Sequence, residues 1–458
     1  MVAKNEYHEV VFTDMTHDAR GVCKIDGYPL FVKNALKGET ALVKITKKNK
    51  HFGLARLVEL RKVSPFRMQP ICEHYDVCGG CSIMHMNYEM QLDFKRYRTV
   101  ETLRKLGKIE CSVSPCVGMS NPYAYRNKVT VFFKYRNGRL MTGMYKRESH
   151  DVVDIKRCHI IPKIHNDIIR FLKAEIEDMN IEIYDDDTGA GVLRGVMIRS
   201  SATDGQLQVT LITSRTRFNE KEALAERLME RFPNLVGVLQ NINAGPNISI
   251  LGQKSRTLIG QETFSDTMLG CRFDISHRAF HQINPLQSVA LFNHAVALAG
   301  LKVSDTVLDA YCGIGTIALC VASRVKAVIG VDIVKESIKN AVANARMNHI
   351  KNAKFIHGAV EDVMTTLKNE TIDVVFVDPP RKGCDKAFLQ TLIELGIPKI
   401  IYISCNVSTF ARDLNCLQAG GYRVGNVTPF DMFPHTSHIE CVSLLVRDGG
   451  SERTETSE

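Results

Sequence analysis

Residues 399–406 (KIIYISCN) constrain the fold more than any other stretch of the chain, because an aliphatic and aromatic run ends there abruptly in a small polar turn. Such a run predicts a strand buried on both faces, as in a parallel sheet. Open α/β sheets place reactive side chains in the turn that follows such a strand. Cys405 is therefore a candidate nucleophile. A single cysteine among 14 is more often a small core residue, so its assignment depends on the neighbouring motifs.

Three other strand-and-turn units support an α/β sheet. Residues 306–311 are followed by the glycines Gly313 and Gly315 and by the start of a helix, and glycines there let a cofactor approach the backbone. A strand over 327–331 ends in Asp332, which is placed to accept hydrogen bonds from ribose hydroxyls. A strand over 372–377 leads into Asp378, and the two prolines after it fix a rigid turn that aims this carboxyl into the crevice of the sheet.

The glycine loop is compatible with two cofactors. The pattern Gly313-x-Gly315-x-x-Ala318 satisfies a loose dinucleotide fingerprint, which would indicate an NAD-dependent oxidoreductase. Dinucleotide folds, however, usually place the first glycine directly after the strand, whereas residues 309–312 intervene here. S-adenosylmethionine sites prefer an acid just ahead of the glycines, which Asp309 supplies. The sequence favours S-adenosylmethionine.

A cysteine cluster indicates a metal centre. Three cysteines lie within ten residues, with two glycines that allow the backbone to fold closely around a bound group (Cys72, Cys78 and Cys81). In a reducing compartment such cysteines are more often ligands than core residues. Cys158 is the candidate fourth ligand. Thiolate ligation suits a [4Fe-4S] cluster or zinc, and a fourth ligand at His74 or His159 would favour zinc.

The charge distribution points to a polyanionic partner. The chain has 59 basic and 50 acidic side chains, and residues 1–67 alone carry 13 basic against 7 acidic ones. Short alternating runs with glycine turns between residues 7 and 60 predict a small barrel with a cationic stripe over 44–51. This part resembles a TRAM domain, the small oligonucleotide-binding barrel of RNA-modifying enzymes.

The middle of the chain is less specific. Residues 88–107 predict an amphipathic helix. Basic and aromatic residues interleave between 123 and 147, which is typical of single-stranded RNA binding but equally of alternating strands that face a core. Residues 155–259 alternate helix-like and strand-like segments, and no catalytic motif stands out in them.

Neither an apolar signal core near the amino terminus nor an uninterrupted apolar run of membrane-spanning length is present, so we expect a cytoplasmic protein without membrane contact. The residues do not indicate the oligomeric state, and we expect a monomer.

The motifs occur together in the RNA 5-methyluridine methyltransferases, which this sequence resembles over almost its whole length. The shared features are the glycine loop, Phe-x-Gln-x-Asn at 280–284, Asp-Pro-Pro-Arg-Lys-Gly at 378–383, Ser-Cys-Asn at 404–406 and Asp-Met-Phe-Pro-x-Thr-x-His-x-Glu at 431–440. The last segment is polar and proline-constrained, and we expect it to be too irregular for core packing. The cysteine cluster matches the iron–sulfur members of the family, and segments at 125–128 and 147–150 match its central domain.

The resemblance implies a domain organisation. An OB-like TRAM barrel is expected over 1–62, an α+β central domain with the cysteine cluster over 63–265, and a Rossmann-like class I methyltransferase sheet over 266–447. The helix at 88–107 is expected to pack on the catalytic domain, and residues 448–458 are expected to form a disordered tail.

The resemblance also implies a reaction. Carbon 5 of uracil needs activation before it accepts a methyl group, and addition of the Cys405 thiolate to carbon 6 would provide it. Glu440 would then remove the proton from carbon 5. Further residues resemble the family's cofactor contacts (Gln282, Tyr311, Asp332 and Asp378). The target uridine must leave its stack, which costs a few kcal/mol and favours loop or unpaired RNA.

Alternatives remain open at this level. The cysteine cluster favours 23S rRNA as the substrate, and tRNA is the alternative; an RNA-binding protein without catalytic activity is a more distant one. The family usually has proline after Ser-Cys-Asn, where this chain has Val407, which puts the stiffness of that turn in question.

Overall fold

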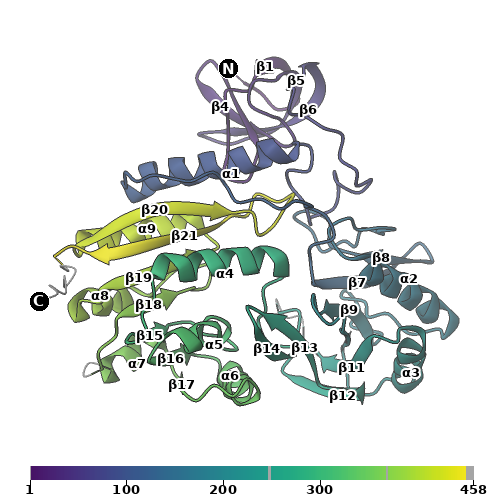
Figure 1. The fold of residues 1–458 in the computed structure, drawn as a ribbon. Helices are drawn as coiled ribbons and strands as arrows, with labels where there is room; N and C mark the ends of the chain where they lie inside the picture. The colour runs from purple at the N-terminus through teal and green to yellow at the C-terminus, as the bar shows by residue number, and fades with distance from the viewer. Residues whose placement is uncertain (1, 246–248, 368–369, 450–458) are drawn as a thin grey trace, which may run out of the picture.

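The computed structural model describes residues 2–245, 249–367 and 370–449, which form three large sheets, a separate hairpin and the helices around them (Figure 1). Residues 450–458, most of the tail expected to be disordered, lie outside this part.

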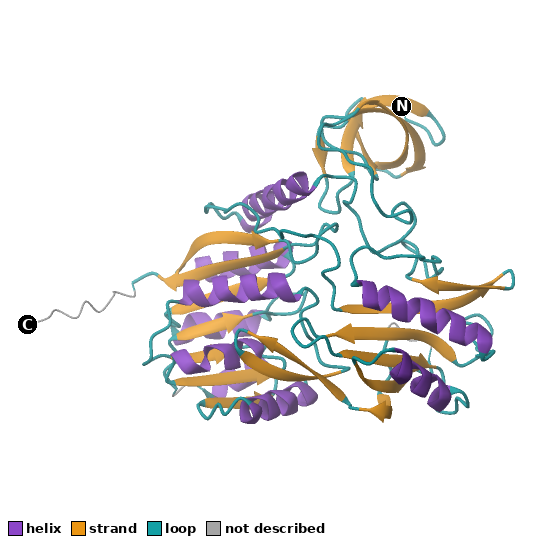
Figure 2. Cartoon of the chain, turned by 45° about the vertical axis from the view of Figure 1, so that its right-hand side comes forward, coloured by secondary structure: helices purple, strands orange, loops and turns teal. Residues whose placement is uncertain are grey.

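The amino-terminal strands form the predicted small barrel. Their order in the sheet is β1-β5-β6-β4-β3-β2, and Figure 2 shows them curled around a common axis. Buried and half-buried residues alternate along β5, so that Ala41, Val43 and Ile45 point into the barrel core. The strands are β1 (Tyr7–Val11), β2 (Asp14–Met15), β3 (Gly21–Ile25), β4 (Tyr28–Val32), β5 (Thr40–Lys48) and β6 (Gly53–Lys62).

The central part is a second six-stranded sheet with two helices. Its order is β12-β11-β10-β9-β7-β8, mostly antiparallel, and α2 (Lys163–Asp178) and α3 (Lys221–Arg231) pack their apolar faces on it. Its α+β architecture is therefore as expected. The strands are β7 (Lys128–Arg136), β8 (Arg139–Gly143), β9 (Leu193–Ser200), β10 (Leu207–Thr213), β11 (Leu235–Ile242) and β12 (Lys254–Gly260).

The carboxyl-terminal part confirms the predicted Rossmann-like sheet. Its order is β17-β16-β15-β18-β19-β21-β20; the first five strands are parallel, and β21 runs antiparallel to both of its neighbours. The strands are β15 (Thr306–Asp309), β16 (Ala327–Asp332), β17 (Ala353–His357), β18 (Val374–Val377), β19 (Lys399–Ser404), β20 (Tyr422–Phe430) and β21 (Glu440–Arg447).

Helices cover both faces of this sheet, and each face has its own apolar core. One core includes side chains from α4 and α5, the other from α7, α8 and α9. The helices are α4 (Pro285–Ala299), α5 (Thr316–Val321) with a 3-10 turn at Ala322–Arg324, α6 (Lys335–Met347), α7 (Val360–Thr366), α8 (Lys386–Leu395) and α9 (Val407–Ala419).

A two-stranded hairpin, β13 (Thr263–Met268) and β14 (Cys271–Ser276), joins the central and carboxyl-terminal parts. The predicted domain boundary between residues 265 and 266 falls inside β13. The boundaries themselves stay predictions.

Helix α1 (Tyr88–Thr102) lies across the carboxyl-terminal strands, above β20 and β21 in Figure 1. It continues into a π-helical turn at Leu103–Gly107 that packs on α9. A buried ion pair between Lys95 and Asp431 fixes it there, and Lys95 Nζ also donates to the Phe433 carbonyl (3.1 Å). The helix thus packs on the part of the chain that the sequence assigned to catalysis.

Within the described ranges, no helix combines the length and the apolar character needed to cross a bilayer.

Candidate active site

The polar residues predicted to act together gather at one edge of the parallel sheet. Asp378 directly follows β18 and Cys405 directly follows β19, and these strands pair in parallel with Val377 opposite Tyr402. Because the carboxyl ends of parallel strands meet at the same edge, the two side chains enter one crevice.

The antiparallel strand β21 brings Glu440 to the same place. Ser404 at the end of β19 pairs with Cys441 near the start of β21, so the next residue outward on each strand is Cys405 and Glu440 respectively. The two predicted catalytic residues, 35 positions apart in the sequence, therefore lie beside each other across the ladder.

The turn that carries Cys405 is held by hydrogen bonds. Asn406 caps α9, its Oδ1 accepting from the Ser408 N–H (3.1 Å) and its Nδ2 donating to the Arg381 carbonyl (3.0 Å). The Ser404 hydroxyl accepts from the Asn406 N–H (3.2 Å). Val407 is the first residue of α9, a position where a proline also fits a helix, and the Asn406 cap restrains the start of this helix.

Burial and neighbouring carboxyls raise the pKa values of the groups at this edge. Burial raises the pKa of the Cys405 thiol to about 12, helped by Glu440 and Asp378 and opposed by Arg381. Burial also raises the pKa of Glu440 well above its usual range, again with Asp378 adding to it and Arg381 opposing. Burial raises the pKa of the Asp378 carboxyl to about 7. The Cys405 thiol is therefore protonated at neutral pH.

A small cavity of about 50 Å³ adjoins this edge and has the features of the predicted cofactor site. Three of the four predicted contacts line it, namely Gln282, Tyr311 and Asp378. Asp332 does not line it but lies directly behind the loop, where its Oδ2 accepts from the Gly313 N–H (2.9 Å) and its Oδ1 from the Val334 N–H (2.7 Å).

The glycine loop needs its glycines for conformation and for space. Gly313 and Gly315 have φ values of 54° and 87°, in the left-handed region. A Cβ on Gly315 would also lie 3.2 Å from the Phe355 ring. The loop then enters α5, which directs its amino terminus at the cavity wall.

The cavity favours a cationic ligand. Asp309 lines it, is 1% exposed, and burial raises its pKa to about 7 although its carboxylate accepts from the Ala318 N–H (3.0 Å). With the half-buried Asp378 it forms a pair of acids that a positively charged sulfonium and ammonium would stabilise. These two carboxyl groups fit S-adenosylmethionine.

The cysteines predicted as ligands surround a second, smaller cavity of about 20 Å³. All four predicted ligands line this cavity (Cys72, Cys78, Cys81 and Cys158). Apolar side chains and His159 line it as well, whereas His74 does not. Burial raises the pKa of each of the four thiols, that of Cys158 to about 11.

Arg147 holds the cysteine loop in place. Its Nε donates to the Cys78 carbonyl (2.9 Å), and its Nη2 donates to the carbonyls of Tyr75 (3.1 Å) and Cys81. Among the described residues, no three His, Cys, Asp or Glu side chains lie close enough together to hold one metal ion. The shared cavity places the four thiols in one region, but their arrangement favours neither zinc nor a [4Fe-4S] cluster, and the metal centre stays a prediction.

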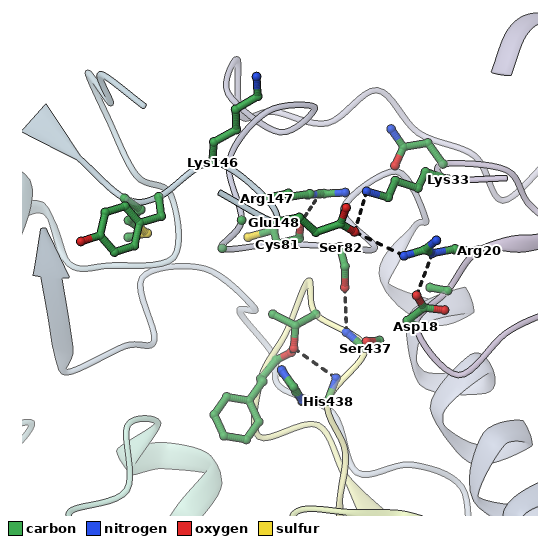
Figure 3. Close-up of a pocket in the computed structure, with 18 of the residues that line it drawn as sticks. Asp18, Arg20, Lys33, Cys81, Ser82, Lys146, Arg147, Glu148, Ser437 and His438 are labelled. Atoms are coloured by element: carbon green, nitrogen blue, oxygen red, sulfur yellow. Dashed lines mark hydrogen bonds and ion pairs between the residues drawn. The ribbon is translucent and has the colours of Figure 1, made fainter. Parts of the chain in front are cut away.

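A cavity of about 650 Å³ is a cleft between the barrel, the central part and the carboxyl-terminal sheet (Figure 3). In Figure 3, Arg20 and Lys33 of the barrel both reach Glu148 of the central part (3.4 and 3.1 Å), and Ser82 accepts from the Ser437 N–H (3.0 Å). These contacts join the three parts around the cleft. We call this cavity the main cleft.

The main cleft is lined by cations that sequence reasoning did not single out as one group. They come from all three parts of the chain (Arg20, Lys33, Arg126, Lys146, Arg147 and Arg381). The one available signal was the basic and aromatic interleaving at 123–147, and the structure divides those residues. Tyr125 and Phe133 are buried in the core, whereas Phe132 and Tyr145 stack on each other (4.1 Å between centroids) at the cleft wall.

The segment before Glu440 corrects one expectation. Residues 431–439 form an irregular loop, but most of its residues are buried, including Asp431, Met432 and Ile439. Helix α1 brackets this loop: its Gln91 accepts from the His435 N–H (2.9 Å). The expectation that this segment is too irregular for core packing was wrong, because α1 covers it and supplies partners for several of its polar groups.

Comparisons with known proteins agree with this geometry. The profile of a family described as tRNA (Uracil-5-)-methyltransferase matches residues 87–448, and that of the TRAM domain matches residues 2–58. A relative from Listeria innocua, named an uncharacterized RNA methyltransferase, is 42% identical over 447 residues, 97% of this chain and 98% of that protein. A Bacillus cereus relative with the same kind of name is 40% identical over 449 residues, 97% of this chain and 98% of that protein.

A solved structure is similar over the whole chain as well. The tRNA (uracil-54, C5)-methyltransferase of Pyrococcus abyssi, in complex with S-adenosyl-L-homocysteine, superposes with a TM-score of 0.79 at 26% identity, covering 96% of this chain and 99% of that one.

Proposed function

This chain belongs to the tRNA (uracil-5-)-methyltransferase family, and from that premise we propose that it methylates carbon 5 of uridine in 23S rRNA with Cys405 as the nucleophile. It is an S-adenosylmethionine-dependent RNA (uracil-C5) methyltransferase with an amino-terminal TRAM domain. The observation that carries the proposed mechanism is the position of Cys405 beside Glu440 at the edge of the cofactor cavity.

The mechanism follows from the chemistry of these two groups. The Cys405 thiolate adds to carbon 6 of the flipped uridine, which makes carbon 5 nucleophilic. Gln282, Tyr311, Asp332 and Asp378 would hold S-adenosylmethionine, whose sulfonium methyl group would pass to carbon 5 and leave S-adenosylhomocysteine behind. The Glu440 carboxylate then removes the carbon 5 proton, and the electrons expel Cys405 from carbon 6.

The raised pKa values suit these roles. A thiolate of high pKa is intrinsically more nucleophilic, and a carboxylate of high pKa is a stronger base, once each has lost its proton. Arg381 lowers the pKa of both groups, so its charge favours the ionised forms that react.

The choice of 23S rRNA rests on the cysteine cavity. Gly80 and Cys81 line both this cavity and the main cleft, so the cysteine loop forms part of the surface on which the RNA would lie. We propose that Cys72, Cys78, Cys81 and Cys158 hold a [4Fe-4S] cluster. The alternative substrate is tRNA, on which the similar Pyrococcus abyssi enzyme acts according to its name. With an RNA substrate of either kind, we propose a cytoplasmic location for the enzyme.

The test of the nucleophile is covalent trapping. The protein is incubated with S-adenosylmethionine and 5-fluorouridine-substituted fragments of 23S rRNA or tRNA, and denaturing gels detect an adduct. Fluorine blocks proton removal, so the wild type should accumulate an adduct with its true substrate. Cys405→Ala should abolish both the adduct and methyl transfer while cofactor binding stays within about twofold.

Cys416→Ala is the matched control, because Cys416 is a half-buried thiol on α9 away from the crevice, and it should behave like the wild type. Glu440→Gln should accumulate an adduct even with unmodified uridine. Normal turnover in Glu440→Gln would show that Glu440 is not the base. An adduct in Cys405→Ala would show that Cys405 is not the nucleophile.

The test of the metal centre is elemental analysis of protein purified without oxygen. The wild type should contain iron and acid-labile sulfide in equal amounts, and Cys158→Ala should lose most of both. Cys111→Ala, a change at a half-buried thiol outside the cavity, should retain them. If the protein contains zinc and no sulfide, the four cysteines bind zinc and not a cluster. If it contains neither iron nor zinc, the assignment of these cysteines as ligands is wrong.

A further inference from the structure

A second large cavity, about 310 Å³, lies in the central part directly beside the main cleft. Phe132 and Tyr145 line both cavities, and their rings stack with an interplanar angle of 12°. A chain that occupies the main cleft can therefore reach the second cavity past these two rings. We call this second cavity the stacking cavity; its wall includes Phe132, Tyr145, Tyr184, Arg194 and Asn243.

The lining of the stacking cavity is aromatic and balanced in charge. The Arg194 guanidinium lies 4.2 Å from the centroid of the Tyr184 ring, and its Nη2 pairs with Asp186 (3.0 Å). Lys134 and Asp185 add one further charge of each sign. A phosphate would meet as many carboxylates as cations here, whereas a planar, neutral group with donors and acceptors meets matching partners of both kinds.

Asn243 contributes a fixed polar side chain to the wall of the stacking cavity. It is 4% exposed, and its Nδ2 donates to the carbonyls of Ser249 (2.9 Å) and Ile250 (3.1 Å). These hydrogen bonds hold this part of the wall in place.

We propose that the stacking cavity binds one unstacked nucleobase of the substrate RNA, close in sequence to the uridine that enters the Cys405 crevice. Aromatic faces supply stacking, and the paired charged side chains of the wall supply donors and acceptors for the polar edge of the base. The cavity volume falls at the lower end of the roughly 300–1,000 Å³ typical of small-ligand sites, which suits a single base. This inference rests on the proposed function, since it assigns a second contact to the same RNA and with it a determinant of sequence selectivity.

A tryptophan reporter tests the proposal directly. The chain contains no tryptophan, so Tyr184→Trp creates a single emitter inside the stacking cavity. The probes are the RNA that the wild type methylates and a series of the same RNA with one abasic nucleotide at each position around the target. Intact RNA should quench the emission of the introduced tryptophan, and one abasic position should abolish this quenching. Tyr135→Trp, at an exposed site that lines neither cavity, is the matched control and should respond equally to the whole series.

Binding affinities give a second, independent readout. Tyr184→Ala should weaken the binding of intact RNA by about fivefold or more, as expected for the loss of one base–aromatic stack. The same change should have no effect on the RNA whose abasic position abolishes the quenching. Additive losses from the protein and RNA changes would overturn the inference, as would equal quenching by every RNA of the series.

The two proposals fail in different ways. If the wild type methylates the RNA while the tryptophan emission of the Tyr184→Trp variant ignores every abasic position, the proposed function stands and the stacking cavity is rejected. Absence of methyl transfer to either class of RNA would reject the proposed function. RNA that is neither methylated nor bound would reject both.

Discussion

Among single residues, the acidic groups around Cys405 determine when the site can react. Cys405, Glu440 and Asp378 all have raised pKa values, and Arg381 is the cation that opposes the first two shifts. A thiol with a pKa of about 12 is almost fully protonated at neutral pH and resists alkylation and oxidation. In its proposed role as nucleophile, Cys405 therefore has to lose its proton before it can attack.

The rate of adduct formation should depend on pH accordingly. Since the Cys405 pKa lies far above neutrality, the thiolate fraction rises about tenfold for each pH unit, and so should the rate of trapping by 5-fluorouridine RNA between about pH 6 and 7. Above about pH 7, ionisation of Asp378 adds a negative neighbour that disfavours the thiolate, so the rise should become shallower. Rapid-quench trapping across about pH 6–9 measures this, with RNA binding measured in parallel as the control. A rate that does not change with pH would contradict the high pKa.

The sequence could predict where these residues lie but not how they titrate. Cys405 and Asp378 each follow a recognisable strand, and parallel strands share one carboxyl edge. Glu440 came only from the family resemblance, because its proximity depends on an antiparallel strand pairing. The pKa shifts depend on burial by residues from several elements, and no local pattern encodes that.

Among the elements, the hairpin β13–β14 depends on one carboxylate for its attachment. Asp266 is 3% exposed on its side chain and accepts from the hydroxyls of Ser201 and Thr203 (both 2.9 Å) and from His281 (3.3 Å). Burial alone would raise the pKa of Asp266, but the hydrogen bonds from His281 and Ser201 outweigh it and lower the pKa to about 2. The residue joins the hairpin to the loop after β9 and to the segment that carries Gln282.

Asp266→Asn should lower the free energy of unfolding by about 2 kcal/mol at pH 7, the value of a shift from 3.8 to about 2. Because the folded pKa is depressed, this stabilisation is complete above about pH 4 and is lost as the pH falls through about 2. Urea unfolding at several pH values measures the difference, which should shrink below about pH 4. Asp204→Asn, at an exposed carboxylate of the same loop, should change stability by less than about 0.5 kcal/mol. A constant difference between the two variants at about pH 7 and about pH 2.5 would show that charge is not the cause.

Strand periodicity and glycine loops made most elements of the catalytic sheet predictable from the sequence. The burial of residues 431–439 was not predictable, because their polar groups find partners on α1, more than 300 residues earlier. Local irregularity indicates a loop correctly, but it does not report whether another element covers that loop.

For the whole molecule, the main cleft is the feature that joins all three parts, and from its cations we infer that RNA lies along it. Lys146 is exposed at the cleft and extends away from the ion pairs around Glu148 (Figure 3). Arg147, in contrast, is occupied by three backbone carbonyls and serves to hold the cysteine loop. Neighbouring basic residues in the sequence thus have different tasks.

Lys146→Ala should weaken RNA binding and reduce the slope of log K against log salt by about 0.7, the contribution of one phosphate contact on a single strand. Fluorescence anisotropy with labelled RNA at several salt concentrations measures the slope. Lys302→Ala, at an exposed lysine before β15 on the opposite, amino-terminal edge of the sheet, should leave the slope unchanged. Equal slopes for the Lys146→Ala and Lys302→Ala variants would show that Lys146 does not contact an RNA phosphate.

The basic amino-terminal segment indicated a polyanionic partner, but the main cleft and the stacking cavity could not be predicted from the sequence. Tyr184, Arg194 and Asn243 belong to a region without any recognisable motif, and strand pairing in the central sheet brings them together. Composition reports that a chain can bind RNA, whereas the sites of contact arise from the tertiary arrangement.

The position of α1 has a consequence for how the protein is made. Asp431, the partner of Lys95 in the buried ion pair, lies 336 residues later in the sequence. The helix therefore emerges from the ribosome long before this partner is translated. At about 5–20 residues per second, that delay is roughly 20–70 s. Until then a lysine that is fully buried in the native state must remain in water, and the helix stays undocked. Final closure of the active site is therefore a post-translational docking event, and nascent chains that stop before residue 431 will present α1 to chaperones.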